Sequence, residues 1–176
     1  MAPYRKGPEK QSAAVSSPAL PRRKHLRRLE KTFDTSRAPL FFLTICVRDR
    51  SPALADAAAS EILVCAWREA LPIYGWKVGR YVVMPDHVHF FAAPASESAR
   101  NLSTFVGGWK RRTQRRIRDT VLPSFAWQAE FFDHLMRGAE SYEQKWEYVR
   151  ANPVRAGLVA KPQDWSNQGE VHVLRW

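Results

Sequence analysis

The order of apolar and polar residues divides this chain into a short region without periodicity and a longer region patterned like strands and helices. Residues 1–37 contain four prolines and the basic run PRRKHLRRLEK, but no sustained apolar period. From Pro39 onwards, apolar runs and amphipathic stripes follow one another. We therefore predict a mobile basic N-terminal arm over residues 1–37 and one folded domain over residues 38–176.

Four runs in the longer region have the β-branched and aromatic content of strands, and three segments have the stripe of an amphipathic helix. The predicted strands cover residues 40–47, 76–84, 87–94 and 127–137. The predicted helices cover residues 62–74, 102–117 and 141–151. We expect Pro153 to stop the third helix, because proline disfavours helical geometry at the residue before it. The remaining residues are expected to form loop with a short edge strand.

The order of the first six elements, β-α-β-β-α-β, predicts an α+β fold of the ferredoxin-like sandwich type. In that architecture an antiparallel sheet carries both of its connecting helices on one face. The third predicted helix is then an addition after the last strand of the sandwich.

The charge balance indicates the kind of partner. The chain has 28 Lys and Arg against 17 Asp and Glu, for a net charge of +11. Such a surface attracts polyanions, and nucleic acid is the partner that it favours. We expect no membrane partner, because no apolar run approaches the roughly 20 residues of a spanning helix. Cys46 and Cys65 lie in apolar surroundings without a CxxC pattern, which indicates reduced thiols and a cytoplasmic location.

The stretch VVMPDHVHFF places two histidines on one predicted strand. His87 and His89 should share a face because successive side chains of a strand alternate, while Val88 should point into the helix-covered core. Two imidazoles on one face could bind one metal ion. An isolated HxH pattern is more often a pair of exposed histidines, so further ligands are needed to favour the metal site.

The stretch EYVRANPVRAGLV offers a ligand and a nucleophile. Tyr148 and Asn152 are four residues apart, about 40° around a helix, and would share one of its faces. An amide oxygen suits a hard cation such as Mg²⁺ or Mn²⁺, and a phenol beside that ion could attack a phosphate. The alternative is structural, with Tyr148 packing on the sheet and Asn152 capping the turn before Pro153.

Three motifs in this order resemble those of a known family. MPDHVHFF, WQAEFFDHLMR and YVRANPVRAGLV are similar to the motifs of HUH-type single-tyrosine transposases, and specifically of REP-associated tyrosine transposases. The resemblance spans residues 39–165 and includes the ferredoxin-like fold.

The resemblance implies a function and a site. The family cleaves and rejoins single-stranded DNA at palindromic repeats that form hairpins, through a 5′-phosphotyrosine intermediate. Tyr148 would be the nucleophile, and His87, His89 and Asn152 would bind Mg²⁺ or Mn²⁺. Insertion-sequence relatives commonly have Gln where this chain has Asn152, which keeps the amide but changes its reach. The assembly would be a monomer or a homodimer.

Tyr142 is a competing nucleophile. The stretch YEQK, from Tyr142 to Lys145, matches the Tyr-x-x-Lys pattern of rolling-circle replication initiators. Tyr142 lies about 240° around the helix from Tyr148, so both cannot face one metal ion. We favour Tyr148, because Asn152 follows it at i+4. Lys145 is then expected to be a solvated helix residue.

Four further polar residues lie near these motifs. Asp133 and His134 should point to opposite faces of their strand, and we expect them to have structural roles. The chemistry of Arg137 is less clear. Asp86 is expected to be a turn residue.

A cluster of cations on the second predicted helix is the candidate hairpin-binding surface. The predicted DNA-binding residues are Arg100, Lys110, Arg111, Arg112, Arg115 and Arg116. Side chains of this kind bind phosphates without reading sequence, although a charged helix face is usually only solvated. The alternative functions are a catalytically silent hairpin-binding protein and a nickase similar to rolling-circle initiators.

Overall fold

A computed structural model describes residues 38–174, so the predicted arm over residues 1–37 lies outside the described part of the chain. Its strands are β1 (Phe41–Cys46), β2 (Trp76–Met84), β3 (His87–Pro94), β4 (Phe132–Leu135) and β5 (Gln168–Glu170). Its helices are α1 (Ala57–Arg68), α2 (Ala70–Tyr74), α3 (Leu102–Thr120), α4 (Ala139–Arg150) and α5 (Asn152–Arg155). Short 3₁₀ turns cover Ala53–Ala55 and Pro162–Asp164.

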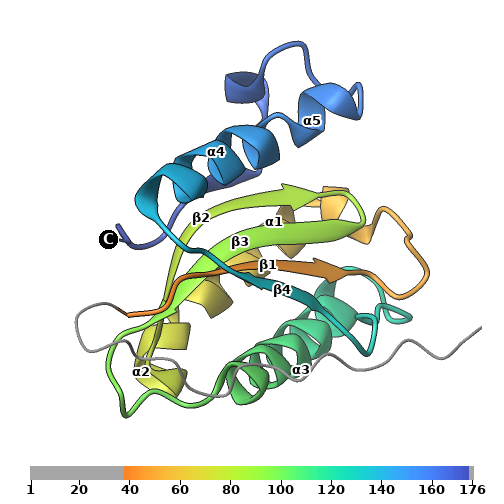
Figure 1. The fold of residues 1–176 in the computed structure, drawn as a ribbon. Helices are drawn as coiled ribbons and strands as arrows, with labels where there is room; N and C mark the ends of the chain where they lie inside the picture. Colours follow the sequence, from red (N-terminus) through yellow and green to blue (C-terminus); the bar gives the residue numbers. More distant parts are fainter. Residues whose placement is uncertain (1–37, 175–176) are drawn as a thin grey trace, which may run out of the picture.

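The five strands form one antiparallel sheet in the order β4-β1-β3-β2-β5. Helices α1, α2 and α3 lie on one face of this sheet, and α4 lies on the other (Figure 1). The predicted α+β fold, with an antiparallel sheet and a helix added after β4, is therefore confirmed. The expected short edge strand is β5, which pairs with β2.

The main hydrophobic core fills the space between the sheet and α1, α2 and α3. Strand residues such as Ile45, Val88 and Phe90 project into it. The indoles of Trp67 in α1 and Trp109 in α3 stack at its centre, with ring centroids 5.5 Å apart and planes 5° from parallel. This packing fixes the helices against the sheet through apolar contact.

A smaller core lies on the opposite face, beneath α4. It is formed by buried residues from β1, β2 and β3 together with Tyr142 and Val149 of α4. The Tyr142 ring meets the Phe91 ring edge to face, with centroids 4.6 Å apart. This second cluster holds α4 over a sheet face that would otherwise be open to solvent.

Two predicted elements differ from the observed ones. The helix predicted over residues 62–74 is two helices, α1 and α2, because Pro72 has no N–H to donate back to Arg68. The strand predicted over residues 127–137 is only the short β4. Trp127 forms one isolated bridge with Val47, and its indole N–H donates to Thr113 Oγ1 at 3.0 Å in the core.

The membrane expectation can be compared with the helices. Within the residues that the structure describes, no helix has both the length and the apolar character that crossing a bilayer requires.

Neighbouring glycines in α3 should respond oppositely to alanine. Gly107→Ala should raise the free energy of unfolding by up to about 1 kcal/mol, because Ala has the higher helix propensity, and its Cβ would meet only the Arg111 guanidinium, at 3.4 Å. Gly108→Ala should lower that free energy by about 1–3 kcal/mol through overpacking, because its Cβ would lie 2.6 Å from Tyr74 Cζ. Urea unfolding of both variants measures the difference, and equal shifts would contradict the packing of α2 on α3.

Candidate active site

The two histidines begin β3, where the chain leaves the turn that follows β2. His87 pairs with Cys46 and His89 pairs with Thr44 across the β1–β3 ladder. Their Nε2 atoms lie 3.1 Å apart on the sheet face that α4 covers. Val88 is fully buried in the main core on the other face. The predicted alternation of this strand is confirmed.

Both imidazole rings are held by hydrogen bonds at Nδ1. Asp86 Oδ1 lies 2.6 Å from His87 Nδ1, and Asp86 Oδ2 receives the Arg50 Nε–H at 2.8 Å. Thr44 Oγ1 lies 2.8 Å from His89 Nδ1. With Nδ1 engaged in this way, each Nε2 points toward the other ring. Asp86, expected to be only a turn residue, therefore also orients His87.

The electrostatics of the site keep His89 uncharged. Burial lowers the pKa of the His89 imidazole to about 3. Nearby positive charges lower this pKa further, namely those of His87, Lys145, Arg155 and Arg50. His89 is neutral at physiological pH, which is the form in which an imidazole can bind a metal ion.

The geometry of the two imidazoles fits a divalent cation. Two metal–ligand bonds of about 2.1 Å at right angles separate their ligand atoms by about 3 Å, close to the 3.1 Å between the Nε2 atoms. Both Nε2 lone pairs are available when each ring carries its proton on Nδ1, where Asp86 and Thr44 accept it. Over residues 38–174, no group of three or more His, Cys, Asp or Glu side chains could hold a metal ion. Other ligands would have to come from an amide, water or phosphate.

The two tyrosines of α4 have different environments. Tyr142 is 4% exposed and packs in the smaller core, where burial raises the pKa of its phenol to about 12. Tyr148 is 61% exposed. The expectation that these tyrosines face different directions is confirmed, and Tyr148 is the accessible phenol.

Lys145 connects the Tyr148 helix to the histidine site. Its Nζ lies 5.6 Å from the centroid of the Tyr148 ring and 5.1 Å from that of Phe42. The Phe42 ring in turn stacks on His89, with centroids 5.5 Å apart. Lys145 is half-buried, so the expectation of a solvated side chain was wrong. Figure 1 shows the C-terminal end of α4 above the end of the sheet where β2 finishes and β3 begins.

Arg155 joins Tyr148 to Asn152. Its guanidinium lies 4.0 Å from the centroid of the Tyr148 ring and donates to the Tyr148 carbonyl oxygen at 2.7 Å. The same guanidinium donates to the side-chain oxygen of Asn152. In this conformation the Asn152 amide oxygen therefore binds Arg155.

The chain between Tyr148 and Asn152 is not one continuous helix. Helix α4 ends at Arg150, and Asn152 begins α5. The predicted stop near Pro153 is correct for α4, but Asn152 is helical. Pro153 is tolerated because it lies in the first turn of α5, where a backbone N–H needs no helical partner.

The WQAEFFDHLMR motif contributes the edge strand β4. His134 pairs with Phe42 and therefore lies on the histidine face, whereas Asp133 pairs with Leu43 and points to the main core. The prediction that these two side chains face opposite ways is confirmed. Arg137 is exposed, after the end of the strand.

The predicted DNA-binding cations lie on or before α3, on the other side of the sheet from the histidines (Figure 1). Several have partners within the protein. Lys110 donates to the Gln128 and Ala129 carbonyl oxygens at 2.6 and 2.8 Å. Arg112 and Arg116 form ion pairs with Glu69, of 2.6 and 3.1 Å.

The remaining predicted cations are Arg100, Arg111 and Arg115, which are exposed. The Arg115 side chain is 86% exposed and lies 3.9 Å from Asp119. These are the side chains of this group most accessible to a phosphate.

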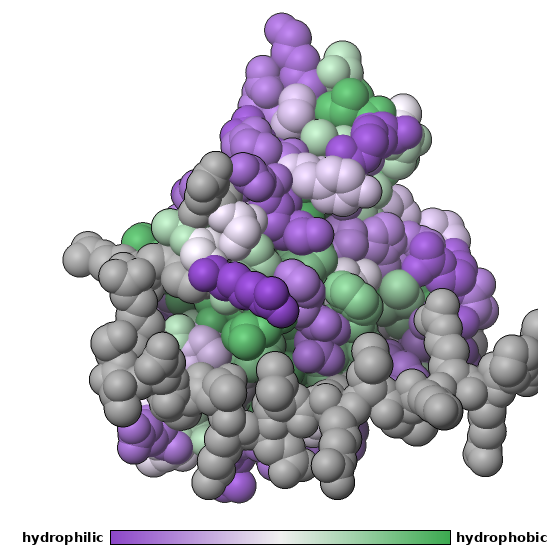
Figure 2. Space-filling view, in the orientation of Figure 1, coloured by the Kyte–Doolittle hydropathy of each residue, from purple (hydrophilic) through white to green (hydrophobic). Residues whose placement is uncertain are grey.

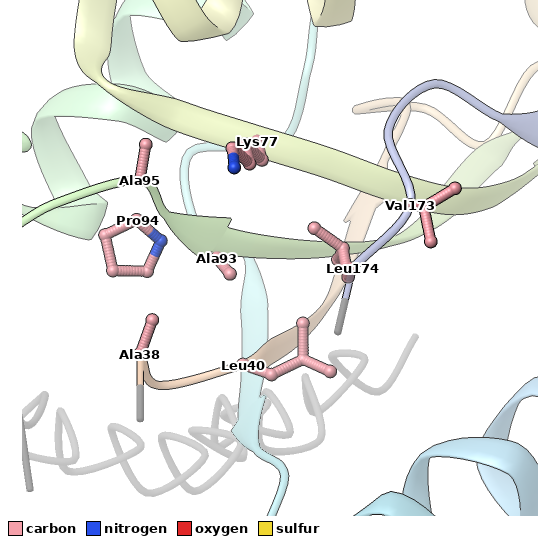
Figure 3. A pocket seen from close by; sticks show the side chains of 8 residues that line it. All are labelled: Ala38, Leu40, Lys77, Ala93, Pro94, Ala95, Val173 and Leu174. Atoms are coloured by element: carbon pink, nitrogen blue, oxygen red, sulfur yellow. The ribbon is translucent and has the colours of Figure 1, made fainter. Parts of the chain in front are cut away.

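A pocket lies away from this chemistry. Its volume is about 300 Å³, and its lining includes Leu40, Lys77, Ala93 and Leu174 (Figure 3). It lies near Pro94, at the opposite end of β3 from His87. Apart from Lys77 its lining is apolar or backbone, so the pocket offers no set of groups for catalysis.

Comparison with known proteins gives the class of this chain. The model of the family described as "Transposase IS200 like" matches residues 41–152. The chain belongs to this family of transposases.

Individual relatives narrow the similarity to REP-associated tyrosine transposases. A Haemophilus influenzae protein assigned to that group is 24% identical over 142 residues, which are 75% of this chain and 80% of the relative. The REP-associated tyrosine transposase of Escherichia coli K12 is 25% identical over 91 residues, covering 51% of this chain and 52% of that protein. The resemblance found in the three motifs is confirmed.

Solved structures support the fold. A REP-associated tyrosine transposase bound to a REP hairpin superposes with a TM-score of 0.63 at 24% identity, over 74% of this chain and 75% of that one. A transposase from Deinococcus radiodurans R1 superposes with a TM-score of 0.50 at 19% identity, over 69% and 95% of the two chains.

Proposed function

We propose that this protein is a metal-dependent single-tyrosine transposase that cleaves and rejoins single-stranded DNA beside hairpin-forming repeats. The observation that carries the proposal is the exposed Tyr148, on the helix that packs over the sheet face where the His87 and His89 Nε2 atoms converge. Membership of the IS200-like family and similarity to a transposase bound to a REP hairpin support the same assignment.

Tyr148 is the proposed nucleophile. Its phenol oxygen would attack the scissile phosphorus, forming a 5′-phosphotyrosine bond as the bond from phosphorus to the 3′ oxygen breaks. The phenol proton leaves Tyr148, and the released 3′ oxygen ends as a hydroxyl. One ester replaces another, so attack by a 3′-hydroxyl can reverse the step without ATP. Lys145 and Arg155, which contact the Tyr148 ring, would bind the phosphate charge.

His87, His89 and Asn152 are the proposed ligands of Mg²⁺ or Mn²⁺. When bound, the cation would neutralise and orient the scissile phosphate. Asn152 binds Arg155 through the amide oxygen that it would offer to the metal. We infer that Arg155 releases Asn152 and turns to the DNA phosphate when the site is loaded. Because α4 packs on the sheet of its own chain, these contacts favour a site completed within one subunit.

A catalytically silent hairpin-binding protein is the second candidate. The bond between Arg155 and Asn152 favours it, because that bond occupies the third proposed ligand. A covalent complex of protein and DNA that survives denaturation would separate the two candidates in favour of the enzyme.

The exposed arginines of α3 are the proposed contact for the hairpin stem. Arg111 and Arg115 lie on the opposite side of the sheet from the histidines. A hairpin bound there would have to send its single strand around a sheet edge to reach Tyr148. Strand β4 forms the edge nearer to β1 and the histidines.

Removing one hydroxyl from α4 tests the nucleophile. Tyr148→Phe should abolish cleavage and the covalent adduct but leave hairpin affinity within about twofold, because the exposed ring is retained. Tyr142→Phe, on the same helix, should still form the adduct. Incubation with labelled single-stranded repeats and denaturing electrophoresis measure both variants. Undiminished cleavage by Tyr148→Phe would remove Tyr148 from this role.

Loss of an imidazole tests the metal site. His87→Ala should weaken Mn²⁺ binding, measured by calorimetry, by at least about tenfold and should lose cleavage that depends on the metal. His134→Ala is the matched control, since His134 is exposed on the same face and should leave Mn²⁺ affinity unchanged. Equal cleavage by the wild type with and without chelator would rule out the proposed cation.

Two arginine pairs on α3 should separate DNA binding from stability. Replacing Arg111 and Arg115 with Gln should reduce the salt dependence of hairpin binding by about 0.9 per lost phosphate contact, with little change in stability. Replacing Arg112 and Arg116 with Gln should instead lower the free energy of unfolding by about 0.5–1 kcal/mol, because partly exposed ion pairs with Glu69 are lost. An unchanged salt slope in the first variant would remove this surface from the proposal.

A further inference from the structure

Phe132 is an exposed aromatic residue at the edge of the sheet. It begins β4, and 59% of it is exposed. The preceding Phe131 packs against the main core, so the alternation of the strand turns Phe132 to the opposite face. That face carries the two histidines.

The strand register puts Phe132 in the same row as His89. Thr44 pairs with Phe132 on one side and with His89 on the other. Side chains directly opposite each other in antiparallel strands project from the same face. The Thr44 hydroxyl also hydrogen-bonds to His89, so Phe132 is separated from the site only by Thr44. Two strand spacings amount to about 10 Å, within reach of a nucleotide next to a phosphate at the histidines.

The exposure of Phe132 is unusual in its location. Among the described residues, the large hydrophobic side chains that are strongly exposed are Ile73, Phe132, Tyr148, Leu158 and Val173. Phe132 and Tyr148 are the aromatic ones, and both lie on the side of the sheet that carries the histidines. In Figure 2, apolar surface is exposed among polar residues in the region of β1 and β4, between α3 and α4.

We propose that Phe132 is a stacking platform for an unpaired nucleobase next to the scissile phosphate. The inference rests on the proposed function and adds a binding site to it. An aromatic face binds the π-face of any base, so the contact would hold the strand without reading its sequence. Phe132 lies on the edge that a single strand would cross between a stem on α3 and Tyr148 on α4.

The test compares a side chain with a nucleotide. The probe is a repeat hairpin with a single-stranded tail, used intact or with one abasic position, in chelator so that no cleavage occurs. Phe132→Ala should weaken binding of the tailed hairpin by about tenfold or more, and Phe132→Trp should retain it. An abasic site at the contacted nucleotide should weaken wild-type binding equally, and it should add nothing to Phe132→Ala. Ile73→Ala, an exposed apolar truncation on α2, is the control and should bind normally.

A second measurement needs no variant. 2-Aminopurine at the same tail position should lose fluorescence when it stacks in the wild-type complex. The proposal is overturned by unchanged affinity of Phe132→Ala, or by equal losses for tailed and tailless hairpins. It is also overturned if Phe132→Ala changes only the oligomeric state in light scattering, since edge pairing between two copies would then explain the exposure. Adduct formation through Tyr148 is scored separately, so failure here leaves the proposed function standing.

Discussion

The antiparallel pairing of β1 with β3 is the constraint on which the candidate site depends. It aligns Cys46 with His87 and Thr44 with His89, and it gives the His89 ring a hydrogen-bond partner from a different strand. A slip of one residue would turn both histidines into the main core and expose Val88, which is fully buried. Apolar burial on one face therefore sets the aim of the imidazoles on the other.

The second requirement is that α4 stays on the histidine face. Tyr142 and Val149 anchor it in the smaller core. Arg80 adds polar support, since it donates to Glu143 at 2.7 Å and its guanidinium lies 5.2 Å from the centroid of the Tyr142 ring. With one side of the helix buried in this way, Tyr148 is presented to solvent at the end where β3 begins. One tyrosine of the helix stabilises it, and the other is available for chemistry.

Local patterns were sufficient for much of this arrangement. Alternation along a strand gave the shared face of His87 and His89, and the angle between residues on a helix separated Tyr148 from Tyr142. These features depend only on the period of an isolated strand or helix. The order of the elements likewise predicted the sheet and the helices on one of its faces. The break between α1 and α2 was missed, although Pro72 was its visible signal.

Features that depend on contacts between distant segments could not be read from the sequence. Thr44 reaches His89 only through strand pairing, and Lys145 reaches Phe42 only because α4 packs on that face. The positions of Arg112 and Arg116 beside Glu69 depend on the packing of α3 on the end of α1. Phe132 was missed for the same reason, because an FF pair does not indicate which ring meets the core.

The central claim is that strand register aims two imidazoles at one divalent cation beneath the end of α4. The most direct measurement is anomalous diffraction at the manganese edge, from crystals grown with Mn²⁺ and a non-cleavable hairpin with a single-stranded tail. The account predicts one manganese peak bonded to Nε2 of both His87 and His89. Manganese bound elsewhere, with these two Nε2 atoms still in direct contact, would contradict it.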